Sequence, residues 1–355
     1  MTDLDHAKLE GFASRMLDML NGAAAALMLS VGHRVGLFDA MARMPASTPS
    51  EIAGAAGLQE RYVREWLGAV SCAGIVEYDS ARDLYSLPPE HAAMTSRMAG
   101  GRNMAATAQL IAVFGAVEDR IVEKFHEGGG VPYPEYGRFG RVMAELSAAG
   151  FDASLVGATL PLVPGIVDRL QEGIDVADIA TGSGHAVNVM ARAFPASSFV
   201  GFDLSEEGIG HARREAAEMG LQNATFEVRD VAALDTLERF DLITTFDAVH
   251  DQAQPGLVAK AVFDALRPGG YWLCVDVGAS SHLGENLGHP MGTFLYSVSC
   301  MHCMSVSLAY DGAGLGAMWG VQQARDLFSA AGFGEVHVRS VPGDTVNNYY
   351  VCRRA

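Results

Sequence analysis

The chain has little of what would mark a secreted or membrane-spanning protein. Its five cysteines are scattered and odd in number among 355 residues, which is typical of a reducing compartment and not of a disulfide framework. The longest apolar run, residues 23–31, is too short to cross a bilayer. The first residues are acidic and include no basic segment, so we expect no export signal and a cytoplasmic protein.

Basic residues are also scarce. The chain has 25 Lys and Arg against 42 Asp and Glu, which gives a formal net charge of −17. Proteins that hold nucleic acid usually present clustered positive charge. We therefore expect a small-molecule partner, with no nucleic acid and no membrane. The length and the 49% hydrophobic content are those of a globular protein of about two domains.

The first 95 residues show the pattern of a winged helix. Apolar spacing over 7–44 predicts two helices separated at Gly22, and helices are also predicted from Thr48 to Gly57 and from Gln59 to Gly74. A short hairpin, 75–87, comes next. The winged helix could bind DNA, but residues 1–100 carry 8 basic against 12 acidic side chains. For residues 1–95 we favour a domain that dimerises or covers the functional site, and we expect a homodimer because the first helices are strongly apolar.

The rest of the chain predicts a helical linker with a lid over residues 96–170, and then an α/β domain over 171–355. From Gly173 onward, apolar strands alternate with helices, which predicts a Rossmann-like, doubly wound, seven-stranded sheet. The parallel strands are expected at 176–179, 199–202, 225–228, 240–244 and 271–275. A final hairpin of 336–341 and 349–352 adds an antiparallel edge to the sheet.

The first of these strands is followed by a glycine-rich turn that lacks two features of phosphate-binding loops. A dinucleotide fingerprint would need a third glycine where Val187 stands, and no lysine comes after the turn as in a P-loop. Gly182 and Gly184 let the chain turn tightly and expose backbone amides. S-adenosylmethionine, a nucleoside without phosphates, is the cofactor that fits this pattern.

Four acidic residues end four successive predicted strands, where ligands bind in such sheets. Asp203 is expected to accept the ribose hydroxyls, and Asp178 to fix the turn or reach the ligand's ammonium group. Asp230 is expected to accept the adenine amino proton. The full set expected around the cofactor consists of Asp178, Gly182, Gly184, Asp203, Leu204, Asp230, Val231 and Asp247. Asp203 could instead be a helix cap, and Asp230 an ordinary turn residue.

Motifs along nearly the whole chain resemble one family. They are 178–184, 201–203, 229–230, 246–251 and 266–270 in the second half, with 62–66, 87–91, 129–133 and 347–350 as more specific ones. Together they are similar to class I S-adenosylmethionine-dependent methyltransferases with an N-terminal winged helix, typified by a mycobacterial member. Ala180 departs from the pattern, because many class I enzymes have a glycine there, and we expect a slightly less open turn.

The resemblance and the chemistry of methyl transfer suggest three catalytic candidates. His250 is expected beside the transferred methyl group, where an imidazole could take a proton from the acceptor. Asp251 could orient the ring. Tyr133, in the lid motif, resembles a residue that closes over the sulfonium. The alternatives are a packed histidine that shapes the pocket and a tyrosine on the surface of a loop.

Downstream residues are candidates for acceptor contacts, because the family fold would place their segments over the acceptor. They are Glu285, Asn286, His289, His302 and Trp319. We expect no metal: Cys300 and Cys303 lack a second pair at zinc-finger spacing, and Asp276 is followed by Val277, unlike the magnesium-dependent catechol enzymes.

The leading hypothesis is therefore a methyltransferase that acts on a thiol or hydroxyl group of a small molecule. The alternative is a winged-helix transcriptional regulator that senses S-adenosylmethionine through an inactive domain. A dehydrogenase is a weaker third possibility, because Val187 breaks the dinucleotide pattern.

Overall fold

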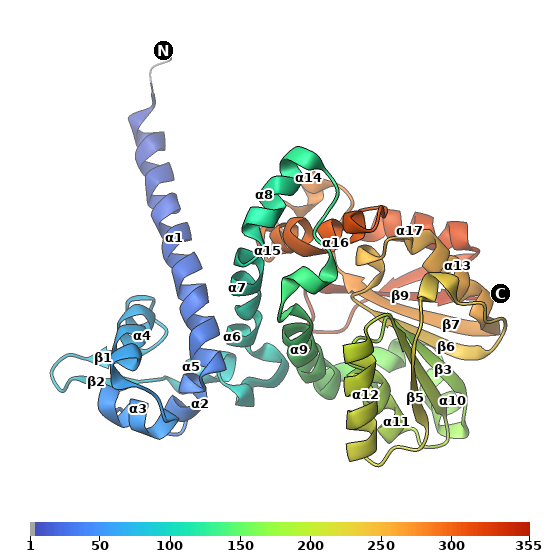
Figure 1. Cartoon of the computed structure of the whole chain (residues 1–355), viewed down its shortest axis with the longest axis horizontal. Helices are drawn as coiled ribbons and strands as arrows, with labels where there is room; N and C mark the ends of the chain where they lie inside the picture. The colour runs from blue at the N-terminus through green and yellow to red at the C-terminus, as the bar shows by residue number, and fades with distance from the viewer. Residues whose placement is uncertain (1–3) are drawn as a thin grey trace. The chain divides into compact units, whose positions relative to one another are not determined.

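The computed structural model describes residues 4–355, and contacts within it divide the chain into two compact units, Met1–Gly115 and Ala116–Ala355. The segment 96–170, expected from the sequence to be a linker and lid, contributes to both units. Figure 1 labels the elements of each unit along the chain.

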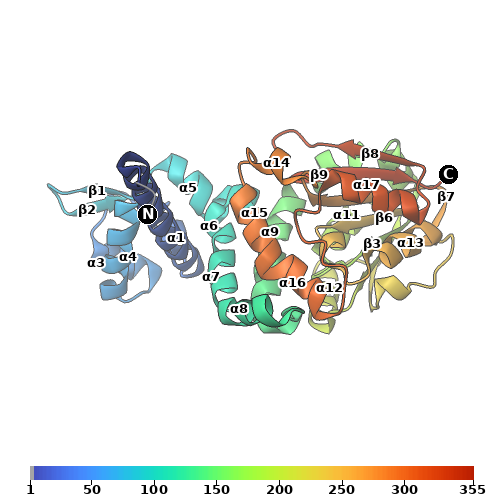
Figure 2. The ribbon, with the colours of Figure 1, turned by 90° about the horizontal axis from the view of Figure 1, so that it is seen from above.

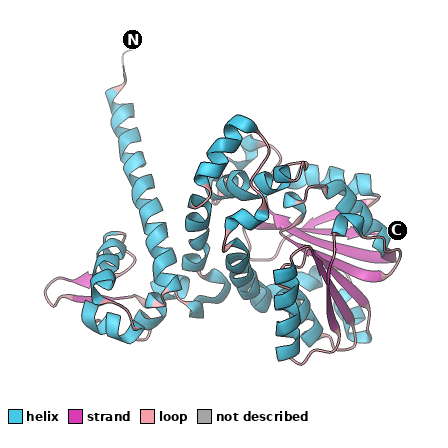
Figure 3. Ribbon diagram, viewed as in Figure 1, coloured by secondary structure: helices cyan, strands magenta, loops and turns pink. Residues whose placement is uncertain are grey.

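The first unit is a winged helix preceded by one long helix and followed by shorter ones. The two-stranded wing is antiparallel and pairs Tyr78 with Tyr85 (Figure 3). Buried side chains of α2 to α4 form its core around Trp66, whose indole N–H donates to the Met28 carbonyl over 2.9 Å. The elements are α1 (His6–Arg34), α2 (Leu37–Met41), α3 (Pro49–Ala56), α4 (Glu60–Cys72), β1 (Glu77–Asp79), β2 (Leu84–Ser86), α5 (Pro89–Thr95), η1 (Arg97–Arg102), α6 (Met104–Thr107) and α7 (Gln109–Gly115).

The helix α1 corrects the prediction of a break at Gly22. The helix runs without interruption through Gly22, and the chain turns only at Gly36, which has a φ of +77°. An exposed glycine inside a helix costs about 1 kcal/mol relative to alanine, which a 29-residue helix tolerates. Every residue from 4 to 24 is exposed, so the first half of this helix has no partner among the described residues.

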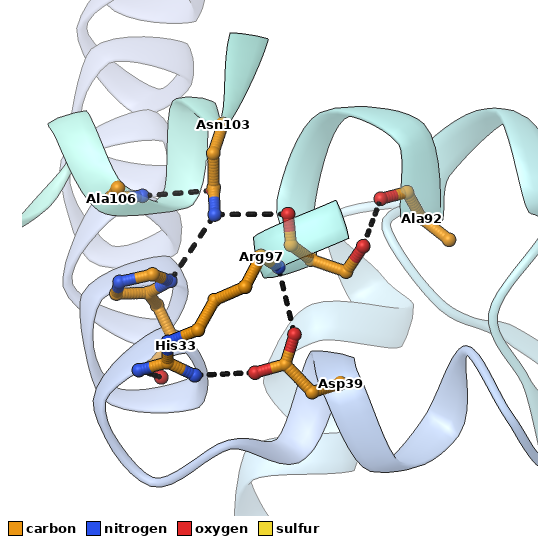
Figure 4. Close-up of polar contacts among 7 residues, drawn as sticks. His33, Asp39, Ala92, Arg97, Asn103 and Ala106 are labelled. Carbon is orange, nitrogen blue, oxygen red and sulfur yellow. Dashed lines mark hydrogen bonds and ion pairs between the residues drawn. The ribbon is translucent and has the colours of Figure 1, made fainter. Parts of the chain in front are cut away.

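A polar network closes the C-terminal end of α1 onto the η1 and α6 segment (Figure 4). Asp39 accepts the backbone N–H of Arg97 over 2.7 Å and also pairs with its guanidinium group. The Arg97 guanidinium donates to the His33 carbonyl over 3.0 Å. Asn103 joins its side-chain amide to the His33 ring and caps α6 through Ala106. These bonds satisfy polar groups that the packing of the helices buries.

The second unit is built on a seven-stranded sheet in the order β5-β4-β3-β6-β7-β9-β8, which confirms the predicted fold class (Figure 1). Strands β3 to β7 are parallel, and β9 runs antiparallel between β7 and β8. The observed bounds differ from the predicted strands by a few residues at most, except for the longer β7, and β8 ends before its predicted last residue: β3 (Asp175–Ile179), β4 (Ser198–Asp203), β5 (Ala224–Val228), β6 (Phe240–Phe246), β7 (Leu266–Val277), β8 (Glu335–Arg339) and β9 (Asn347–Arg353).

Helices cover both faces of this sheet (Figure 2). The buried side chains of α10 (Ile166–Glu172), α11 (His185–Ala193) and α12 (Glu206–Glu218) pack in one hydrophobic cluster. Those of α13 (Pro255–Ala265) and α17 (Gly320–Ala331) pack in the other, with Trp272 and Phe328 among them. This layering fixes the carboxyl ends of β3 to β7 at one edge, where ligands bind in doubly wound sheets.

Two helical segments lie outside the layers, except that the end of the first packs into the sheet's hydrophobic cluster. The first contains α8 (Glu118–Glu127), η2 (Tyr133–Tyr136), α9 (Phe139–Ser154), the π-turn η3 (Leu155–Thr159) and η4 (Leu160–Leu162). The second contains α14 (Leu283–Asn286), α15 (Gly292–Val298), the π-turn η7 (Ser299–Cys303) and α16 (Met304–Ala309). Short 3₁₀ turns, η5 (Val231–Ala233) and η6 (Val249–Asp251), come after β5 and β6.

Among residues 4–355, no single helix combines the length and the apolar composition of a membrane span. The bent pair of 139–162 and 166–172 passes that test only when its two parts are taken together. Leu155, Leu160, Ile166 and Leu170 of this pair are buried in the sheet's hydrophobic cluster.

Candidate active site

The turn between β3 and α11 leaves its backbone open at the carboxyl edge of the sheet. Gly182 and Gly184 have φ values of +57° and +74°, which favour glycine. No atom lies within 4 Å of the place that a Gly182 Cβ would take, whereas a Cβ at Gly184 would overlap Ala212. Ala180 also has a left-handed φ of +55°, so this departure from the family pattern places strain of about 1–2 kcal/mol in the turn.

Asp178 stabilises this turn through its side chain. It is buried, and its two carboxylate oxygens accept the hydroxyls of Thr181 over 2.6 Å and of Thr244 over 2.5 Å. Burial raises the pKa of Asp178 to about 6, against the effect of the two hydroxyls. Of the two roles expected for this residue, the observed bonds are those of the turn support.

Asp203 ends β4 beside the glycine turn. One of its carboxylate oxygens accepts the Gly182 N–H over 2.7 Å, and the other accepts the Ser205 N–H over 2.8 Å. Partial burial raises the pKa of Asp203, although these backbone donors act in the opposite direction. Ser205, and not Asp203, caps α12 through the Gly208 N–H. Each oxygen retains a lone pair, so the carboxylate can still accept two further donors.

The residues expected around the adenine come from the same edge. Asp230 begins η5 and accepts the Ala232 N–H over 2.9 Å, while Val231 is buried beneath it. Leu204 has 66% of its surface exposed next to Asp203. Because β5, β4, β3 and β6 are neighbours in the sheet, the four acids that end them lie along one row, with Asp247 at its end.

His250 forms a buried pair with an aspartate that the sequence reasoning had not assigned to it. Its Nδ1 lies 2.6 Å from Oδ1 of Asp276, which is fully buried on β7. Burial alone would lower the pKa of His250, but the Asp276 carboxylate, with Cys303 as a second neighbour, raises it well above the usual value. The prediction that Asp251 orients the ring is therefore wrong. The sequence feature that could have identified this partner is a single acid, Asp276, within the apolar run of β7.

Asp251 and Asp247 flank this pair without binding its ring nitrogen. Asp251 accepts the side-chain amide of Gln252 over 3.2 Å, and burial raises the pKa of Asp251 to about 6. Asp247 has a left-handed φ of +49° and an exposed side chain. Desolvation by the surrounding protein atoms is the main cause that raises the pKa of Asp247 to about 7, and repulsion from Asp276 adds to it.

Tyr133 lies in a cluster of rings that joins the two helical segments outside the layers. Its ring packs edge-on against Phe139 at 5.6 Å and against His302 at 5.4 Å between ring centroids. His302 stacks on Phe139 at 3.7 Å and meets Tyr136 at 4.6 Å. Burial, with a smaller contribution from His250, lowers the pKa of His302 to about 3, so this imidazole is neutral.

The charges that act on Tyr133 connect this cluster of rings with the carboxylates at the sheet edge. Loss of surrounding water, and then the charges of Asp251 and Asp203, raise the pKa of the Tyr133 phenol. Its side chain still has 41% of its surface exposed. The phenol is therefore within electrostatic range of both the ribose-binding candidate and the turn that carries His250.

The remaining acceptor candidates do not all lie together. Glu285 accepts the Ser280 hydroxyl, and the buried Asn286 bonds both backbone groups of Ser280, so these two close their own loop. His289 accepts the Met291 N–H. Trp319 is buried in the cluster beneath the sheet, against Phe328. Of the five, His302 is the one that the structure brings next to Tyr133.

Within residues 4–355, no group of three or more His, Cys, Asp or Glu side chains is arranged to hold a metal ion. Cys300 and Cys303 are free thiols on the π-turn η7.

Two known families match this chain. Residues 23–97 match the Rv2258c-like winged HTH domain, and residues 170–326 match a methyltransferase domain. These matches show a winged HTH domain followed by a methyltransferase domain, and they support an enzyme that uses S-adenosylmethionine. The open backbone at Gly182 and the carboxylate of Asp203 beside it fit that cofactor.

Individual relatives agree with this class. The ubiquinone/menaquinone biosynthesis C-methyltransferase of Desulfotalea psychrophila is 23% identical over 49% of this chain and 72% of its own length. The ubiquinone biosynthesis O-methyltransferase of Cereibacter sphaeroides is 32% identical over 37% of this chain, and the match spans about half of that relative. Human N-acetylserotonin methyltransferase, solved with S-adenosylmethionine, has a similar fold, with a TM-score of 0.70, 15% identity and coverage of 100% and 99% of the two chains.

Proposed function

We propose that the protein transfers the methyl group of S-adenosylmethionine to a hydroxyl oxygen of a small molecule. The observation that carries this proposal is the buried pair of His250 and Asp276 at the carboxyl edge that also holds Asp203. A hydroxyl group needs a base more than a thiol does, because phenols ionise near pH 10 and thiols near pH 8.5. The O-methyltransferases among the relatives also favour oxygen over sulfur.

His250 is the proposed general base. Asp276 accepts from its Nδ1, so the tautomer with a proton on Nδ1 leaves Nε2 to take the acceptor's proton. The raised pKa means that the ring acts as a base on the alkaline side of its titration, where it has lost its second proton. Proton transfer of this kind accelerates a reaction by about 10²- to 10⁴-fold.

The cofactor residues would act through binding and orientation. When bound, S-adenosylmethionine supplies a methyl group on a positively charged sulfur, which needs no further activation. Asp203 would accept the ribose hydroxyls, and Asp230 with Val231 would border the adenine. Tyr133 would close over the sulfonium, where the electron-rich face of its ring favours a cation.

The test is a screen of phenols, hydroxy acids and thiols for release of S-adenosylhomocysteine. His250→Gln and Asp276→Asn should lower turnover on the true acceptor while cofactor affinity, measured by calorimetry, stays nearly constant. His337→Gln is the matched control, because His337 is exposed on β8. Equal turnover of wild type and His250→Gln would refute the proposed base, and a thiol as best substrate would refute the choice of oxygen.

The alternative function, a regulator that senses the cofactor, needs a DNA-binding surface. The two arginines of α4, Arg61 and Arg64, both pair with glutamates on the same helix, Glu65 and Glu60. Their charge is thus compensated on the face that would enter a groove, which disfavours DNA binding. Electrophoretic mobility at several salt concentrations would reveal binding if it exists.

We also propose that α1 pairs with α1 of a second copy. Leu9, Phe12, Met16 and Leu20 lie on one face of this helix, and each has at least 41% of its surface exposed. A long apolar helix face in water is not stable without a partner. The double variant Phe12→Glu/Leu20→Glu should therefore yield a monomer in light scattering, whereas the control Ser14→Glu should not. A monomeric wild type would exclude the pairing.

A cytoplasmic location is the proposal that fits the five free cysteines. Fractionation of cells that produce the protein, with a secreted protein as marker, would test it.

A further inference from the structure

The short helix α16 and the π-turn before it contact two separate functional segments of the second unit. In the π-turn, His302 packs among the rings around Tyr133, and the next residue, Cys303, neighbours His250. Two buried serines lie further along, on α16: Ser305 and Ser307. Each serine binds a different segment.

Ser305 holds the loop that carries Tyr133. The backbone N–H of Val131 donates to the Ser305 hydroxyl over 2.8 Å, and both residues are buried. A Cβ at the preceding residue, Gly130, would overlap the Ser305 carbonyl, so only glycine allows this approach. Further along the loop, the Tyr136 phenol donates to the Met301 carbonyl over 2.7 Å. The loop is thus bonded to this helical segment on both sides of Tyr133.

Ser307 holds the turn that carries His250. Its hydroxyl donates to the Gln252 carbonyl over 2.9 Å and accepts the Gly314 N–H over 3.0 Å. The loop after α16 continues this contact, because the Gly316 N–H donates to the His250 carbonyl over 3.1 Å. The Ser307 side chain is completely buried, and both of its bonds go to backbone groups.

We propose that Ser305 and Ser307 are positioning residues that set the Tyr133 loop and the His250 turn from one helix. The assignment of roles to Tyr133 and His250 rests on the proposed function; the bonds themselves do not. A buried N–H or C=O that loses its partner is costly, so removal of either hydroxyl should loosen its own segment. A general packing role would instead affect both segments alike.

Amide hydrogen exchange on the full-length protein distinguishes separate positioning of the two segments from a general packing role. The measurement needs no methyl-acceptor substrate. Ser305→Ala should speed exchange of the Val131 amide by about fivefold, the equivalent of one neutral hydrogen bond, and leave the Gly314 amide unchanged. Ser307→Ala should give the reverse pattern. Ser297→Ala, which removes an exposed hydroxyl bonded within α15, is the control and should change neither amide.

Kinetics provide the second readout. Ser305→Ala should weaken cofactor binding about fivefold with an unchanged pH profile of turnover. Ser307→Ala should leave cofactor affinity unchanged and shift that pH profile, because the surroundings of His250 change. If Ser305→Ala does not fold, Tyr136→Phe tests the same loop by removing the phenol's bond to Met301. If Ser307→Ala does not fold, Ser307→Cys keeps a weaker donor in the same place.

Equal acceleration of both amides by both serine variants would overturn the proposal, as would no acceleration at all. Absence of methyl transfer with every acceptor would refute the proposed function, yet the exchange experiment would still decide whether the two serines hold these segments separately.

Discussion

The role of Asp203 gives the sharpest quantitative prediction. Its carboxylate already accepts two backbone N–H groups, from Gly182 and Ser205, and the remaining lone pairs are those that would accept the ribose hydroxyls. A hydrogen bond to a charged group contributes about 1.5–3 kcal/mol. Asp203→Ala should therefore weaken the binding of S-adenosylhomocysteine roughly 10- to 150-fold, since each 1.4 kcal/mol is a factor of ten.

The same substitution also removes the acceptor of the Gly182 and Ser205 amides, so a loss of affinity could come from a damaged turn alone. A double cycle separates the two effects, with 2′-deoxy S-adenosylhomocysteine as the second ligand. The wild type should bind the deoxy ligand more weakly than the parent. Asp203→Ala should bind both ligands equally.

Calorimetry with both proteins and both ligands gives the four affinities that this cycle needs. Circular dichroism of each protein shows that it is folded. If the variant discriminates between the two ligands as strongly as the wild type does, the carboxylate does not bind the ribose and the assignment is refuted.

Three further predictions concern the buried titratable groups. His250→Gln should lower turnover by about 10²- to 10⁴-fold in the assay of product release, with cofactor affinity unchanged. Asp276→Asn removes the carboxylate that raises the pKa of His250, so turnover should begin to rise at lower pH than in the wild type; an unchanged pH profile would exclude this role. Burial raises the pKa of Asp178 from 3.8 to about 6, so the folded state favours its protonated form and this group should cost stability as the pH rises from 4 to 6. Asp178→Asn should remove that loss, which is at most about 3 kcal/mol in denaturant unfolding.

The sheet and its order of acids were predictable because they depend on short-range patterns. Apolar runs of strand length alternate with helices, and a doubly wound sheet brings their carboxyl ends to one edge. Asp203 and the glycine turn could be found in this way. The winged helix was predictable from its order of helices and hairpin, and the motif at Thr48 forms the expected capping box with Glu51.

The error at α1 has a local cause. The sequence pattern indicates a break at Gly22, but glycine lowers helix stability only modestly, and nothing near this position forces the chain to turn. The actual end lies at Gly36, where a left-handed φ requires it. Both glycines look alike in the sequence, and only the packing of the next helix distinguishes them.

The partner of His250 illustrates a different kind of limit. Asp251 adjoins it in the sequence, whereas Asp276 lies 26 residues away on the neighbouring strand. The parallel pairing of β6 with β7 brings Asp276 close to the turn after β6. Register between strands is a tertiary property, so proximity along the chain suggested the wrong acid.

The cluster of rings around Tyr133 was even less accessible to sequence reasoning, since His302 is distant along the chain from the rings that it contacts. Their meeting depends on the π-turn at Ser299–Cys303, which adds a residue to the helix and rotates the residues after it. Ser305 and Ser307 both lie on the regular helix α16 that follows the π-turn, where residues two apart point to opposite sides. The π-turn therefore sets the orientation of α16 relative to α15, and a substitution that restores regular α-helical geometry there should disturb the Tyr133 loop and the His250 turn together, because both are bonded to α16.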